Sequence, residues 1–335
     1  MKAHVFSASA IAALCAGTAF AAPISADSAL TLYHSYTVNS GSAPAAVRIS
    51  TLPGSLVLQS DLASTVDDPT ATNTTSVNTV IGNPFADPVV PFSSERTDET
   101  TLPGGSEGSA AAYSVEITAV DDPEADPFVT SIVERTINNS GSASAEITSD
   151  PVAAAARASF RNERGYLFEN TSDALVSFNI AGDVRASFLS TYDGTDGFSR
   201  ASGTLFSEFG SGIGAEVGYL PLAPYLRTIT EEGEGAMVAE TLATSGEGFD
   251  GFVFSAATSA PGTGSPVEAA LDVTFRYLFS ISLEPGGSLE MRTGFRQFNA
   301  VEYAPGPSPV PLPASLSFLL AGLVGLGVAR RCTRA

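Results

Sequence analysis

Four carboxylates lie within six residues of the chain and could together bind a metal ion. They are Asp121, Asp122, Glu124 and Asp126. Calcium takes about 6 to 8 oxygen ligands, mostly from carboxylates and carbonyls, and loops between strands often supply them. The spacing does not match an EF-hand loop, which also needs a glycine for its sharp turn. A calcium site and a solvated acidic loop are therefore both open, and the solvated loop is the default interpretation.

Few other side chains could carry out nucleophilic or acid–base chemistry. Between the two terminal segments, which hold Cys15 and Cys332, the chain has a single histidine, His34, and no cysteine. A Cys–His pair is therefore excluded, as is a zinc site built from cysteines or several histidines. His34 lies in a strand-like stretch without a nucleophile-elbow sequence, so we expect a solvent-facing strand position rather than a catalytic triad.

A pair of carboxylates would suffice for glycoside hydrolysis, although their separation in space cannot be derived from a sequence. Glu231, Glu232 and Glu234 cluster between predicted strands, which indicates a solvated turn. The chain has no tryptophan, the best side chain for stacking on a sugar, but its 9 tyrosines could substitute. We therefore expect no enzyme and no cofactor. A secreted carbohydrate-active enzyme or a carbohydrate-binding adhesin that uses a carboxylate pair is the alternative.

The charge balance is strongly acidic, with a formal net charge of −20. Lys2 and the arginines at 330, 331 and 334 lie near the ends of the chain, which leaves 12 arginines against 36 carboxylates in the body. A field of this sign repels nucleic acid and anionic lipid. Nucleic acid is therefore excluded as a partner.

Alternation of apolar and polar residues dominates residues 110–304. Residues 174–188 alternate on both sides of a two-residue turn signal at Gly182-Asp183. Residues 273–293 alternate in the same way around 284–287, which predicts a hairpin. Strands spaced by about 10 residues with no helix between them predict an all-β body, a β-sandwich or jelly roll.

Two further pieces precede this body. Residues 22–61 contain short strand-like stretches separated by turns and form an N-terminal strand region. Residues 62–109 are rich in Thr, Ser, Asp, Asn and Pro, with an isolated strand-like stretch at 77–81. Their composition and turn signals predict a flexible loop or linker.

Residues 1–21 have the pattern of a secretory signal peptide. Lys2 provides the positive charge, an apolar stretch follows, and Ala19 and Ala21 are the small residues at positions −3 and −1 of a cleavage site. We therefore expect export by a Sec-type route and a mature chain that begins at Ala22.

The C-terminal residues 305–335 combine a proline-rich spacer, a short apolar run and an arginine cluster. The run at 315–329 would form a helix of about 22 Å, short against a hydrocarbon core of about 30 Å. The arginines would stay on the cytoplasmic side, which leaves the body on the outer face. The motif that precedes the run and the arginines that follow it are Val310, Pro311, Leu312, Pro313, Ala314, Arg330 and Arg331.

This tripartite order resembles the PEP-CTERM sorting domain, and residues 310–335 are similar to its VPLPA-CTERM variant, with Leu312 in place of the glutamate of the common Pro-Glu-Pro form. In that family an exosortase cleaves the tail, and the members are exported proteins associated with exopolysaccharide and biofilm matrix. The resemblance implies exosortase and exopolysaccharide as partners. It also implies a precursor tethered to the inner membrane, followed by a location at the cell surface or in the extracellular matrix with a non-catalytic role.

Overall fold

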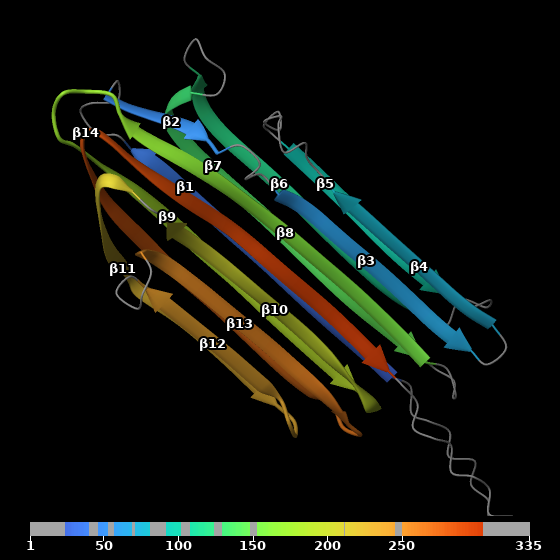
Figure 1. The fold of residues 1–335 in the computed structure, drawn as a ribbon. Coiled ribbons are helices and arrows are strands. Elements are labelled where there is room, and N and C mark those ends of the chain that lie inside the picture. The colour runs from blue at the N-terminus through green and yellow to red at the C-terminus, as the bar shows by residue number, and fades with distance from the viewer. Residues whose placement is uncertain are drawn as a thin grey trace, which may run out of the picture.

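The computed structural model describes ten segments of the chain. They are residues 24–39, 46–52, 57–68, 71–80, 92–101, 108–123, 129–147, 153–210, 212–244 and 250–303. These segments contain fourteen β-strands, joined by antiparallel pairing into one hydrogen-bonded network (Figure 1). The predicted all-β class is confirmed.

The strands follow one another along the chain with few residues between them. They are β1 (Ile24–Asn39), β2 (Val47–Thr51), β3 (Val57–Asp68), β4 (Ala71–Val80), β5 (Phe92–Thr101), β6 (Gly108–Pro123), β7 (Val129–Ile147), β8 (Ala153–Asn170), β9 (Val176–Asp193), β10 (Thr195–Phe209), β11 (Ile213–Glu232), β12 (Met237–Thr244), β13 (Asp250–Thr263) and β14 (Val267–Tyr303).

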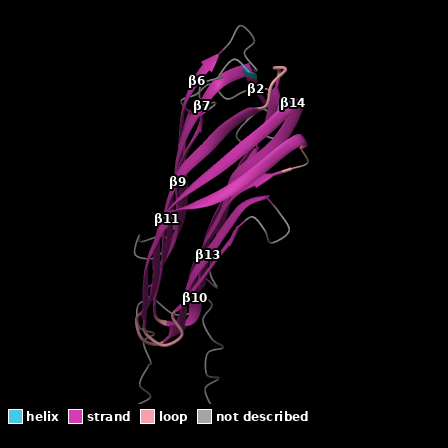
Figure 2. Ribbon diagram, turned by 90° about the vertical axis from the view of Figure 1, so that its left-hand side faces the viewer, coloured by secondary structure: helices cyan, strands magenta, loops and turns pink. Residues whose placement is uncertain are grey.

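The strands pack face to face as two layers, which Figure 2 shows nearly edge-on. The front layer in Figure 1 has the order β12–β13–β10–β14–β8–β3–β4, and the rear layer has the order β11–β14–β9–β1–β7–β6–β5. Strand β14 belongs to both layers. Its first arm, residues 267–283, pairs with β9 and β11, and its second arm, residues 288–303, pairs with β8 and β10. Strand β2 pairs with both β7 and β8 and so also links the layers.

An aromatic cluster fills one part of the space between the layers. Phe252 of the front layer packs on Phe275, Tyr277 and Phe279 of the rear layer, with ring centroids 4.7–6.2 Å apart. Phe209 meets Phe279 edge-on at 4.8 Å. The alternation along each strand turns these rings inward, because successive side chains of a strand point to opposite faces.

A chain of polar side chains crosses another part of the interior. Asn139 donates to Gln297 at 2.8 Å, Gln297 donates to Asn299 at 2.7 Å, and Asn299 donates to the Ser28 hydroxyl at 3.0 Å. Ser28 donates in turn to the carbonyl oxygen of Arg200 at 2.6 Å. The chain runs from β7 to β14, then to β1 and β10, so it connects the two layers by hydrogen bonds as well as by apolar contact.

The prediction of a loop or linker at residues 62–109 is wrong for the residues that the structure describes. They belong to β3, β4, β5 and the start of β6. Their polar side chains bond to one another across the layers. Ser64 of β3 donates to Asp98 of β5 at 3.0 Å and lies 2.7 Å from the Thr100 hydroxyl. Strand β1 lies between β7 and β9, so the N-terminal strand region is an integral part of the body.

Two predicted turns also differ. The chain turns at residues 284–287, but the arms on either side pair in different layers, so this is a crossover and no hairpin. At Gly182-Asp183 there is no turn, because β9 continues through both residues. Gly182 is buried and faces the ring of Tyr277, where an added Cβ would overlap that ring.

Candidate functional site

The outer face of the rear layer is predominantly acidic. Its carboxylates on β1, β6, β7, β9 and the first arm of β14 are accompanied by only two arginines on those strands, Arg185 and Arg276, among the described side chains. Arg276 donates to Asp183 at 2.5 Å, and Arg185 lies over the Tyr33 ring at 5.3 Å. The acidic residues of these strands include Asp27, Glu116, Glu146, Asp183, Asp193, Glu268 and Asp272.

The outer face of the front layer carries five of the 12 arginines of the body, on β8, β10 and the second arm of β14. Arg161 lies directly opposite Arg296 in the pairing of β8 with β14. Arg157 and Arg200 flank Ala300 of β14 on its two sides. We call these residues the arginine face; they are Arg157, Arg161, Arg200, Arg292 and Arg296.

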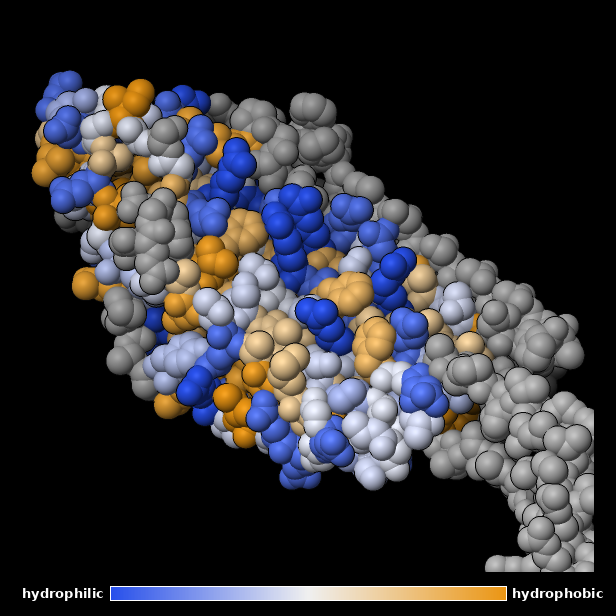
Figure 3. Space-filling model, turned by 60° about the horizontal axis from the view of Figure 1, so that its bottom comes forward, coloured by the Kyte–Doolittle hydropathy of each residue, from blue (hydrophilic) through white to orange (hydrophobic). Residues whose placement is uncertain are grey.

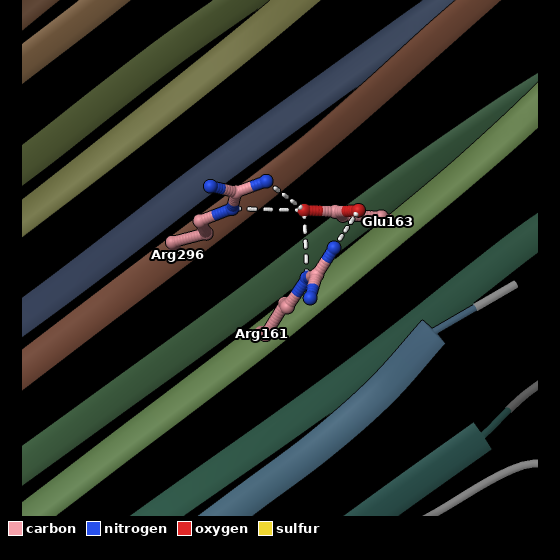
Figure 4. A network of polar contacts seen from close by, with 3 residues as sticks. All are labelled: Arg161, Glu163 and Arg296. Carbon is pink, nitrogen blue, oxygen red and sulfur yellow. Dashed lines mark hydrogen bonds and ion pairs between the residues drawn. The ribbon is translucent and has the colours of Figure 1, made fainter. Parts of the chain in front are cut away.

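Glu163 fixes two of these arginines in place (Figure 4). Arg161 donates to both oxygens of Glu163, at 2.7 and 2.6 Å, and Arg296 donates to Oε1 at 2.8 and 2.7 Å. Burial alone would raise the pKa of Glu163, but the hydrogen bonds and charges of Arg161 and Arg296 together hold it below its usual value. Arg296 also lies 5.7 Å from the centroid of the Phe206 ring. Two cations therefore share one carboxylate. Carboxylates also accompany the other arginines of the face, because Glu208 lies directly opposite Arg292 and Glu302 lies two residues beyond Ala300 on β14.

An open groove of about 400 Å³ lies next to this ion pair. Arg200, Arg296 and Phe298 border it, and residues of β10, β13 and β12 form its floor. The floor presents hydroxyl groups, among them those of Thr204 and Ser255, whose oxygens lie 3.1 Å apart. Figure 3 shows strongly hydrophilic residues gathered over the middle of the surface, with pale and orange residues between them. Such a groove presents hydrogen-bond donors, small side chains and two guanidinium groups to a ligand.

His34 lies in the interior, so the predicted solvent-facing position is wrong. It has an exposed fraction of 1%, because the alternation of β1 turns Leu32, His34 and Tyr36 inward together. Its Nε2 lies 2.8 Å from the hydroxyl of Tyr277. Burial lowers the pKa of His34 to about 3 and raises the pKa of Tyr277 above its usual value. The neutral pair has a structural role in the core.

We expect the protein to lose stability as the pH falls from 6.5 towards 5. The pKa of His34 is about 3 in the folded chain and 6.5 in the unfolded chain, so the unfolded state binds the proton first. The contribution of neutral His34 is complete above pH 6.5 and decreases by up to about 2 kcal/mol at pH 5. Urea unfolding between pH 5 and 7 measures this slope. His34→Gln should flatten it, and an unchanged slope in the variant would contradict the assignment.

The acidic residues predicted to bind calcium lie only partly in the described residues. Asp121 and Asp122 belong to the end of β6, where the register shifts between Asp121 and Pro123, so these two positions are strand rather than loop. Glu124 and Asp126 lie outside the described residues. Within the described part of the chain, no group of three or more potential metal ligands comes together. A calcium site here stays a prediction.

The predicted turn at residues 231–234 is where β11 ends and the chain leads into β12. Glu231 and Glu232 are the last residues of β11 and are exposed, and Glu231 accepts a hydrogen bond from the Val238 amide at 2.7 Å. Gly233 and Gly235 have φ values of 90° and 82°, the left-handed region that favours glycine. The hydrogen bond of Glu231 therefore helps to hold the connection between β11 and β12.

The predicted sorting and cleavage residues lie outside the described residues. They are Ala19, Ala21, Val310, Pro311, Leu312, Pro313, Ala314, Arg330 and Arg331. None of the residues that the structure describes forms a helix with the length and hydropathy needed to cross a bilayer. The signal peptide and the C-terminal helix stay predictions.

Comparisons with known proteins give little further guidance. No family model matches the chain, and no curated protein matches it significantly. Among solved structures, the chain matches the Type IV competence pilus secretin PilQ of V. cholerae weakly, with 10% identity over 84% of this chain. The match spans 61% of the PilQ chain and has a TM-score of 0.07, which carries no argument about fold or function.

Proposed function

We propose that this protein is an exported, non-catalytic component of the cell surface or extracellular matrix that acts by binding. The observation that carries this proposal is the arginine face beside an open groove. Arginine side chains bind carboxylates and similar anions through paired hydrogen bonds, and such binding needs no chemical step. Aromatic rings and hydrogen-bonded polar groups fill the space between the two layers of the protein. These contacts support a rigid framework beneath the arginine face.

The two ends of the sequence support a location outside the cell. The resemblance to the VPLPA-CTERM tail makes exosortase the expected processing partner, with a membrane-tethered precursor. Export of the body would then present both outer faces to the surroundings of the cell.

A carbohydrate-active enzyme is the second candidate, because Glu240 is among the residues that line the groove and Glu163 pairs with Arg296 at its border. A general acid for glycoside hydrolysis needs a raised pKa, whereas the pKa of Glu163 is lowered by its two arginines. Glu240 at the other end of the groove accepts a hydrogen bond from Tyr225 at 3.0 Å and forms an ion pair with Arg227. Both carboxylates are therefore already occupied as acceptors, which favours binding over catalysis.

Deletion of the gene in the native host tests the role. We expect the deletion to reduce surface attachment or retention of matrix, and wild-type protein to restore it. Asp121→Asn with Asp122→Asn, and separately Glu231→Gln with Glu232→Gln, should restore it equally well. Full-length protein with Arg330→Ala and Arg331→Ala should be retained poorly at the surface.

The enzyme alternative makes the opposite prediction in a purified system. Cleavage of a polysaccharide by the purified protein, lost in Glu163→Gln or Glu240→Gln, would replace the binding role by catalysis. A deletion strain with unchanged attachment and matrix would also refute the proposal.

A further inference from the structure

We infer that strand β11 is an interface between two copies of this chain, which pair antiparallel along residues 226–232 about a two-fold axis at Ile229. This contact belongs to the rear layer and does not rest on the proposed function. Three features of β11 support it: its open edge, the apolar side chains exposed along it, and a charge pattern that is complementary to itself.

Strand β11 forms an edge of the rear layer. Among the described strands it pairs only with β14, and β12, which follows it along the chain, pairs only with β13 (Figure 1). An edge strand presents a row of unpaired N–H and C=O groups, to which another chain can add a strand. Pro221 and Pro224 cannot donate to such a ladder, so the part of β11 that can pair fully is the stretch after Pro224.

Large apolar side chains are exposed along the same edge. Of the seven that are exposed among the described residues, five lie on β11 and one begins β12; these six are Ile213, Leu220, Tyr225, Leu226, Ile229 and Met237. Residues 225–229 are exposed on both faces of the strand, whereas β9 and β14 bury one face. Exposed apolar side chains that gather in one place mark a contact surface.

The sequence of this stretch is complementary to itself. Residues 227–231 read Arg-Thr-Ile-Thr-Glu, so two antiparallel copies centred on Ile229 place Arg227 of each copy opposite Glu231 of the other. Thr228 then faces Thr230 of the second copy, and the two Ile229 side chains face each other. Opposite charges and threonine pairs directly across an antiparallel ladder stabilise it. A two-fold contact forms the charged pair and the threonine pair twice.

Both charged side chains are accessible to a second copy. Arg227 forms an ion pair with Glu240, yet 55% of its side chain is exposed. Glu231 is exposed and accepts the Val238 amide through Oε1, and a carboxylate can accept hydrogen bonds through both oxygens. Glutamine at position 231 would still accept a hydrogen bond from Arg227 of the second copy, so Glu231→Gln leaves the contact in place.

The contact brings few like charges together, although the chain as a whole is acidic. Between Glu216 and Glu231, β11 carries one charged side chain, the cation of Arg227. The carboxylates of the outer face project from the face of the sheet, whereas the two copies meet edge to edge. Charges separated by more than about 8 Å are largely screened at physiological ionic strength. The repulsion that excludes nucleic acid therefore acts weakly along this edge.

Sedimentation velocity of the full-length protein in mild detergent, over a range of concentrations, tests the interface. Wild-type protein should dimerise reversibly. Ile229→Lys should weaken dimerisation by about tenfold or more, because two ammonium groups then lie directly opposite each other. Leu226→Lys is the matched control, since it changes the net charge equally on the same strand but faces Glu232 of the second copy. Its affinity should equal or exceed that of the wild type. Both positions are exposed, so unchanged thermal unfolding checks that the variants remain folded.

A disulfide cross-link tests the register in a chain whose Cys15 and Cys332 are replaced by serine. Directly opposite residues of antiparallel strands have Cα atoms about 4.5–5.5 Å apart, within the range of a disulfide. Ile229→Cys should therefore cross-link two copies under mild oxidation. Leu226→Cys should not, because its two copies would lie six residues apart along the ladder, about 20 Å. Equal cross-linking at both positions, equal weakening by both lysines, or wild-type protein that stays monomeric at every concentration would each overturn the inference.

Discussion

Replacing Phe252 by alanine is expected to lower the free energy of unfolding by about 3–5 kcal/mol. Phe252 is fully buried and contacts Phe275, Tyr277 and Phe279, so its removal leaves a cavity lined by rings of the opposite layer. A loss of this size is a large part of the total stability of an ordinary domain, about 5–15 kcal/mol. Urea unfolding at neutral pH, followed by far-ultraviolet circular dichroism, measures it.

Leu220→Ala provides the matched control for this loss. Leu220 is also an apolar strand residue, but 56% of it is exposed on β11, so its truncation should change stability by less than about 0.5 kcal/mol. Similar losses in the two variants would show that the aromatic cluster does not hold the layers together. The groove lies on the outer face, so folded Phe252→Ala protein should bind ligands as the wild type does.

Alternation predicted strands well where one face is apolar. Residues 174–188 and 273–293 alternate as expected, and their apolar side chains face the aromatic cluster. The same rule failed at 62–109, where the inward positions mix the polar Ser64, Asp98 and Thr100 with the apolar Leu62 and Val66. A serine or threonine whose hydroxyl forms a hydrogen bond across the layers can occupy an inward position of a strand, as a valine does. A single sequence does not show which partner it will meet.

The spacing of the arginines along the chain predicts part of the arginine face. Arg157 and Arg161 are four residues apart, as are Arg292 and Arg296. An even spacing in a strand places both side chains on one face, so each pair was predictable. That the two strands would be neighbours was not, because β8 and the second arm of β14 are more than a hundred residues apart in the chain. The groove depends on that pairing and on β10, and so only the structure places it.

Replacing Gly182 by valine is expected to lower the free energy of unfolding by about 3 kcal/mol or more. The sequence suggested a turn at this glycine, yet the structure explains it by the space that the Tyr277 ring occupies, since a Cβ would overlap that ring. Tyr277 cannot move aside easily, because its hydroxyl bonds to His34 and its ring packs on Phe252. Urea unfolding measures the loss.

Gly218→Val separates this steric effect from the general effect of a glycine in a strand. Gly218 lies in β11, where an added Cβ would meet its nearest atom at 3.8 Å, so valine fits and should leave stability unchanged or slightly higher. Both changes replace glycine by the same β-branched residue in a strand, and they differ in what the new side chain contacts. Comparable stability in the two variants would mean that Tyr277 has another place to go and that Gly182 is not the residue that fixes its position. A large loss only at Gly182 would instead show that the absence of a side chain from β9 lets Tyr277 reach across β9 to His34 within the rear layer while its ring packs on Phe252 of the front layer.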